Sequence, residues 1–115
     1  MPVNGIDANY YTVVDLGKMN EFYSRLLGQP GTRAERWSEW TLADGSTFGI
    51  YNAGGKPAGR SGSVMFAVDD VEAMGKRARE AGAEVEDEVT DTPMCRMMFG
   101  ADPEGNQFIL HKRKN

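Results

Sequence analysis

The two halves of this chain repeat one another, and this repetition restricts the fold more than any other feature of the sequence. Val14-Asp15 in the first half corresponds to Val68-Asp69 in the second. Each Asp begins an amphipathic stretch that ends at a glycine, Gly28 or Gly82. A glycine-rich segment separates the halves, and such segments are typical of linkers. Because 115 residues suffice for one core and are too few for two, we expect a single domain in which two modules share a core.

Each half carries the signals of a strand, a helix and three more strands. Tyr, Thr and Val favour a strand at 8–14, and apolar residues at helical spacing predict a helix over 15–27. A second helix is predicted over 69–81, with a capping box formed by Asp69 and Glu72. The remaining strands are expected at 32–37, 39–43, 46–52, 64–68, 84–88, 95–99 and 107–111. The predicted fold class is α+β, with the order βαβββ present twice.

The strongest turn signal is the segment Asp-Pro-Glu-Gly-Asn at 102–106. Asp102 can accept hydrogen bonds from the backbone that follows it, and Pro103 fixes the φ angle that a turn position needs. Gly105 tolerates a positive φ, so the chain is expected to reverse direction here. The sequence therefore predicts a hairpin that leads into the last strand.

Three motifs together give the chain a family resemblance: this turn, the helical segment 22–28 and the segment 68–72. In their order and spacing the chain resembles the glyoxalase, bleomycin-resistance and extradiol-dioxygenase superfamily, also called the vicinal oxygen chelate proteins. The resemblance extends over nearly the whole chain. It implies that two βαβββ modules form a cup-shaped ligand site, with module 1 at about 4–53, a linker at 54–62 and module 2 at about 63–113.

The side chains expected in this cup follow from the alternation of strand residues between two faces. In the first strand Tyr11 and Val13 suit a core, which leaves their neighbours for the cup. In the strand 95–99 the resemblance selects Met97 and Phe99, whereas alternation alone leaves the even-numbered residues as an alternative. The residues expected to contact a ligand are Tyr10, Thr12, Trp37, Trp40, Ser63, Met65, Met97, Phe99, Ile109 and His111.

Metalloenzymes of this superfamily carry metal ligands at three positions, which in this chain hold Ala8, Ser63 and Ile109. Divalent metals at catalytic sites prefer imidazole and carboxylate ligands, so we expect neither a metal nor another cofactor. His111 is the single histidine and suits the end of a strand. Cys95 has no second histidine that would act as its base, so we expect it to be an ordinary buried cysteine without a catalytic role.

Composition excludes several other kinds of partner. The net charge of −4 and a scattered set of basic residues argue against nucleic-acid binding. A single cysteine forms no internal disulfide, and the longest apolar run, 64–68, is much shorter than a membrane helix. A cytoplasmic protein is therefore expected.

The function that the sequence favours is metal-independent binding of a small aromatic or amphipathic molecule, similar to bleomycin-type resistance proteins. One alternative is a lyase, isomerase or dioxygenase with an atypical metal site, and another is an interaction module whose cup stays empty. Open cups would expose aromatic side chains such as Trp37 and Phe99 unless another surface covers them. We therefore expect a two-fold homodimer, and the sequence leaves open whether each cup forms within one chain or between two.

Overall fold

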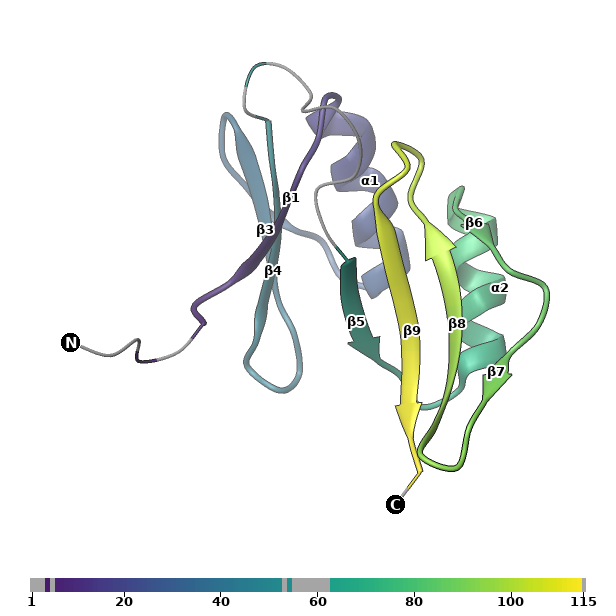
Figure 1. The fold of residues 1–115 in the computed structure, drawn as a ribbon. Coiled ribbons are helices and arrows are strands. Elements are labelled where there is room, and N and C mark those ends of the chain that lie inside the picture. The colour runs from purple at the N-terminus through teal and green to yellow at the C-terminus, as the bar shows by residue number, and fades with distance from the viewer. Residues whose placement is uncertain (1–3, 5, 53, 55–62, 115) are drawn as a thin grey trace.

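Residues 4, 6–52, 54 and 63–114 are described by the computed structural model, and their two helices and two mixed sheets follow the predicted βαβββ order twice (Figure 1). The first module contains β1 (Asn9–Thr12), α1 (Leu16–Leu27), β2 (Thr32–Arg33), β3 (Trp37–Thr41) and β4 (Thr47–Tyr51). The second contains β5 (Ser63–Ala67), α2 (Val71–Ala81), β6 (Glu84–Val85), β7 (Thr90–Asp91), β8 (Cys95–Ala101) and β9 (Gln107–Arg113). The predicted linker lies outside the described residues, except for Gly54.

Each module forms one sheet with the same strand order. The first sheet has the order β1-β4-β3-β2, and the second has the order β5-β9-β8-β6, with β7 paired to β8 as an addition. β1 runs parallel to β4, and β5 runs parallel to β9, while the other pairs are antiparallel. Of the strand expected at 84–88 only residues 84–85 form a strand, β6, and β7 at 90–91 is an additional short strand that the sequence did not predict. In these strand orders β1 and β5, the first strands of the two modules, both lie at an edge of their sheet.

The helices begin and end at the expected capping residues, with one correction. The Asp15 carboxylate accepts a hydrogen bond from the Lys18 backbone N–H at 3.0 Å, as an N-cap should. The predicted capping box of α2 is wrong, because Asp70 is the N-cap and bonds the backbone of Ala73 at 3.0 Å. Glu72 thus lies in the first turn, and its carboxylate forms an ion pair with Arg96 of β8 at 2.7 Å. No helix of the described residues has the length and apolar character needed to cross a bilayer.

The helix-facing sides of the two sheets meet in one aromatic core. Phe48 of β4 lies 5.2 Å from Phe66 of β5, measured between ring centroids, and Tyr23 of α1 lies 4.8 Å from Phe48. The residues of both modules form a single buried cluster, as expected for modules that share a core. Because α1 and this core lie between the sheets, the opposite side of each sheet is on the outside of the molecule (Figure 1). We call these sides the outer faces.

The Asp-Pro turn connects the modules as well as reversing the chain. Asp102 is only 4% exposed and accepts hydrogen bonds from the backbone N–H groups of Glu104 and Asn106, both at 2.9 Å. Its other carboxylate oxygen accepts a bond from the Tyr23 hydroxyl of α1 at 2.7 Å. The Glu104 carboxylate accepts a bond from the Asp15 N–H at 2.9 Å, at the start of α1. The turn of the second module is therefore fixed to the helix of the first.

A second connection runs through Tyr11 of β1. Its hydroxyl donates to the backbone carbonyl of Gln107 and accepts from the Val64 N–H at 2.8 Å. Burial is the main cause that raises the pKa of Tyr11 to about 12, and burial also raises the pKa of Tyr23 well above its ordinary value. Both phenols are therefore neutral hydrogen-bond donors at physiological pH.

We predict that Tyr23→Phe destabilises the fold by about 2 kcal/mol, because it leaves a buried carboxylate oxygen without one of its donors. Urea denaturation followed by circular dichroism measures this change. Tyr51→Phe is the matched control, since Tyr51 is 38% exposed and its loss of a hydroxyl should cost less than about 0.5 kcal/mol. Equal stabilities for the two variants would contradict the role assigned to the Tyr23–Asp102 bond.

Candidate ligand-binding faces

The outer face of the first sheet carries a tyrosine and a glutamate that are joined across three strands. Tyr10 of β1 and Glu39 of β3 both pair in register with Gly49 of β4, which lies between them. The Tyr10 hydroxyl donates a hydrogen bond to the Glu39 carboxylate. A Cβ atom at Gly49 would lie 2.6 Å from the Tyr10 ring, so the ring occupies the space that a side chain would need. The glycine thus lets Tyr10 lie across β4 and reach Glu39.

The Tyr10 phenol is held in its neutral form. Partial burial, followed by the hydrogen bond to Glu39 and its negative charge, raises the pKa of Tyr10 to about 12. Glu39 itself is half-buried. The pair is therefore a neutral donor and a carboxylate in a defined position on the outer face.

A second row on the same face is aromatic. Tyr51 of β4 pairs in register with Thr12 of β1 on one side and with Trp37 of β3 on the other. Trp37 is half-buried and Tyr51 is 38% exposed, so both rings remain available for contact. The two rows place a carboxylate beside two aromatic side chains.

The outer face of the second sheet is mainly apolar. Ile109 of β9 pairs with Met65 of β5 and with Phe99 of β8, and the next row joins His111 to Met97. Met98 is 3% exposed and lies on the helix side, which decides between the two alternatives for this strand. Met97 and Phe99 are therefore on the outer face, the side that the resemblance assigns to the ligand cup. Ser63, the remaining predicted residue of this face, is exposed at the start of β5.

Trp40 is placed on the opposite side of the sheet from that predicted. It pairs in register with Phe48, so both side chains are on the helix side, where Trp40 is 2% exposed. Its indole N–H donates to the Gln29 carbonyl at 3.1 Å, and its ring lies 6.1 Å from Tyr23. Trp40 therefore belongs to the core, and Glu39, its neighbour in sequence, occupies the outer face.

Three residues of the first outer face were not singled out from the sequence as site residues: Glu39, Gly49 and Tyr51. Glu39 is one of several carboxylates in predicted middle strands, for which a solvated face is the simpler interpretation from the sequence. A glycine inside a predicted strand is a sign of close approach by another group, and Gly49 was the signal available for this part of the site.

The residues at the superfamily's metal-ligand positions do not fit a metal. Ser63 and Ile109 lie on the outer face of the second sheet, while Ala8 precedes β1 of the first, and none supplies an imidazole or a carboxylate. Among the described residues, no group of three or more His, Cys, Asp or Glu side chains is arranged to hold a metal ion. Cys95 is buried, and its Sγ lies 3.4 Å from the Thr92 hydroxyl, which is not a general base.

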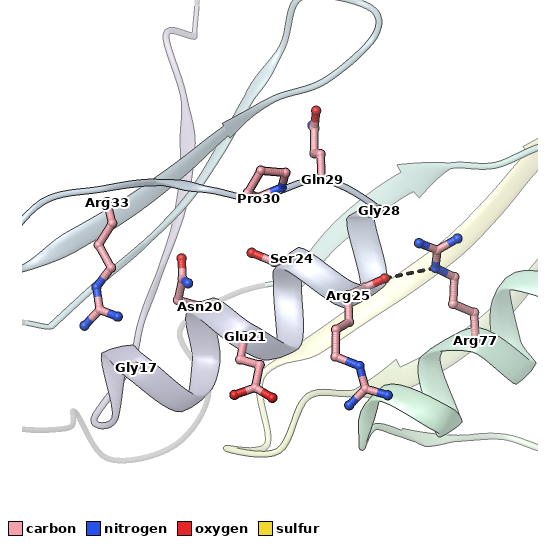
Figure 2. A pocket seen from close by; sticks show the side chains of 10 residues that line it. All are labelled: Gly17, Asn20, Glu21, Ser24, Arg25, Gly28, Gln29, Pro30, Arg33 and Arg77. Atoms are coloured by element: carbon pink, nitrogen blue, oxygen red, sulfur yellow. Dashed lines mark hydrogen bonds between the residues drawn. The ribbon is translucent and has the colours of Figure 1, made fainter.

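Two surface hollows lie away from the outer faces. The first, of about 710 Å³, is beside α1 and includes Arg25, Arg33 and Arg77 (Figure 2). Figure 2 shows these guanidinium groups pointing in different directions, and the Arg77 Nε–H donates to the Arg25 carbonyl at 2.9 Å. The second, of about 630 Å³, is an apolar cleft between the modules that includes Leu42 and Met74. Neither hollow contains the residues predicted to contact a ligand, apart from Met65 at the edge of the cleft.

The fold agrees with that of known proteins. The family model of the Glyoxalase/Bleomycin resistance protein/Dioxygenase superfamily matches residues 5–110. The chain therefore belongs to this superfamily. A crystal structure of a glyoxalase/bleomycin resistance protein from Albidiferax ferrireducens has a TM-score of 0.81 with it, at 22% identity, over 95% of this chain and 98% of that one. The fosfomycin resistance protein FosX from Mesorhizobium loti has a TM-score of 0.76 at 21% identity, over 96% and 93% of the two chains.

A curated relative is similar in sequence as well. The anthracycline biosynthesis protein DnrV of Streptomyces peucetius is 34% identical over 100 residues, which are 83% of this chain and 36% of that protein. The anthracycline biosynthesis protein DauV of a Streptomyces species is 33% identical over 101 residues. The chain thus spans little more than a third of the length of these curated relatives.

We predict that Glu39→Gln lowers the pKa of Tyr10 from about 12 part of the way toward 10.0, because the charge of the acceptor is removed while the burial is kept. Gly49→Ala should lower it too, since the new Cβ displaces the ring. Residue-resolved NMR titration of the tyrosine rings measures this pKa. Glu88→Gln, which removes an exposed carboxylate elsewhere, is the control. An unchanged Tyr10 pKa in Glu39→Gln would show that the pair does not form.

Proposed function

We propose that this chain binds a small aromatic or amphipathic molecule between two outer faces, one of the first sheet and one of the second, without metal-dependent chemistry. The observation that carries the proposal is the composition of these faces. The outer face of the second sheet has an apolar surface made by Met65, Met97, Phe99 and Ile109. Packing of the core does not account for this surface, because the core lies on the opposite, helix-facing side of the sheet. Thioether and aromatic side chains adapt to planar ligands, and exposed apolar surface of this kind usually marks a binding site.

The sequence relatives support a small-molecule ligand. Their names connect them with anthracycline biosynthesis, and they are similar to this chain over most of its length. We extend to this chain only the idea that its ligand is a small organic molecule.

The cup in this proposal forms between two chains. Within one chain the shared core lies between the sheets, so the two outer faces point in different directions and neither encloses a ligand (Figure 1). β1 and β5 are edge strands of their sheets, and strand edges invite contact with another chain. In a two-fold dimer, the first sheet of one chain faces the second sheet of its partner, and this happens twice. The dimer is therefore part of the site.

The shared cup can be tested by mixing two variants. Tyr51→Lys places a charge on the first outer face, and Phe99→Lys places one on the second, so each homodimer should lose binding of a planar probe such as acridine. Mixed dimers contain one cup built from two unaltered faces. Random exchange should then restore about a quarter of the wild-type binding capacity, which calorimetry measures.

Three outcomes would count against this arrangement. No restoration on mixing would mean that each cup forms within one chain. Light scattering that gives 12.7 kDa, the mass of one chain, would exclude the dimer. Binding of acridine that survives in both variants would place the ligand elsewhere, for example in the cleft between the modules.

We predict that treatment with a chelator leaves acridine binding unchanged, because the side chains of Ala8, Ser63 and Ile109 are not suited to hold a divalent metal. Elemental analysis of the purified protein should find less than one metal per chain. Combining Ala8→His, Ser63→His and Ile109→Glu should create affinity for Zn²⁺, detected by calorimetry, which the parent protein lacks. Stoichiometric metal in the parent, or loss of binding with the chelator, would favour an enzyme with an atypical metal site.

A further inference from the structure

The two outer faces differ in charge at their centres. On the second sheet, the outward residues of β5, β9 and β8 include no carboxylate. On the first sheet, Glu39 lies on β3, an inner strand, in register with Gly49 of β4. Glu84 of the second sheet pairs with Ala101 on the short edge strand β6, so its carboxylate is at the margin of that face, whereas Glu39 is central on the first.

The Glu39 carboxylate keeps much of its hydrogen-bonding capacity. None of the ion pairs formed among residues 4, 6–52, 54 and 63–114 includes Glu39. The described donor to its carboxylate is the Tyr10 hydroxyl, which is neutral and therefore does not cancel the charge. A carboxylate has about four acceptor positions, so acceptor capacity remains beyond the bond from Tyr10.

The side chains around Glu39 suit a cation. Tyr10 lies over Gly49 beside the carboxylate, and Tyr51 and Trp37 form the next row of the same face. The faces of aromatic rings attract cations, and this attraction strengthens where water is partly excluded. An anionic ligand would be repelled by Glu39, and a neutral ligand would leave the half-buried carboxylate poorly solvated.

We propose that the first outer face recognises a positively charged nitrogen of the ligand, either a protonated amine or a quaternary nitrogen attached to a planar body. Glu39 provides the counter-charge, Tyr10 holds the carboxylate in position, and Trp37 and Tyr51 contact the cation through their rings. The planar body lies against Met97 and Phe99 of the partner subunit. This inference rests on the proposed function and names the ligand class of the same site.

The test compares a neutral probe with a cation of nearly the same shape. Acridine and N-methylacridinium are titrated into the wild-type dimer, Glu39→Gln and Glu88→Gln, with quenching of tryptophan fluorescence as the readout. The wild type should bind the cation about tenfold more tightly than acridine, and Glu39→Gln should remove that preference. Acridine should bind Glu39→Gln at least as tightly as it binds the wild type, because the half-buried carboxylate is no longer desolvated by a neutral ligand. Glu88→Gln, which has the same net charge as Glu39→Gln, should behave as the wild type.

The remaining outcomes separate the two proposals. Equal affinity of the wild type for both probes overturns the cation inference while the proposed function stands. An equal loss of preference in Glu39→Gln and Glu88→Gln also overturns it, because the effect would then come from net charge alone. If neither probe binds the wild type, the proposed function fails and this inference fails with it. Circular dichroism of each variant confirms that the fold is unchanged.

Discussion

The buried carboxylate of Asp102 is the contact on which the arrangement of the two modules depends. It stabilises its own turn by accepting hydrogen bonds from the backbone of Glu104 and Asn106. It also accepts a hydrogen bond from the hydroxyl of Tyr23, which belongs to the other module. A carboxylate that is almost fully buried is tolerated only when such donors surround it. Because the Asp102 carboxylate binds both its own turn and Tyr23 of α1, the angle between the two sheets depends on the geometry of that turn. That angle determines where the outer faces point.

Much of the fold could be predicted because its signals are local. The N-cap at Asp15, the glycines that end both helices, and the Asp-Pro turn act within a few residues, and each is found where the sequence placed it. The N-cap of α2 was misplaced by one residue, because two adjacent Asp residues are equally good caps, and the capping box predicted from it does not form. Glu72 was then free to bind Arg96, which is distant in sequence and gives no local signal.

The candidate site was less predictable, because it depends on which side of a strand faces the core. Trp40 and Glu39 are adjacent, and hydrophobicity did not assign Trp40, since an aromatic side chain suits either a core or a ligand. The pairing of Trp40 with Phe48 determines that its side chain faces the core. This pairing involves a different strand, so it cannot be read from the strand that contains Trp40. For Met97 and Phe99, alternation alone left the side of the strand open, and only the resemblance selected the outer side on which they lie. Register, which no single strand reveals, was the missing information.

The two hairpin turns show how far the repeated halves have diverged. Asp44 in the first module bonds only to Ser46 among the partners seen for it, and it is exposed, whereas Asp102 reaches into the core. The halves are thus alike in topology but are no longer interchangeable. A chain made of two first halves would lack the carboxylate that orients one sheet against the other. The two halves therefore have different roles: the second supplies the buried carboxylate of Asp102, and the first supplies the Tyr23 hydroxyl that binds it.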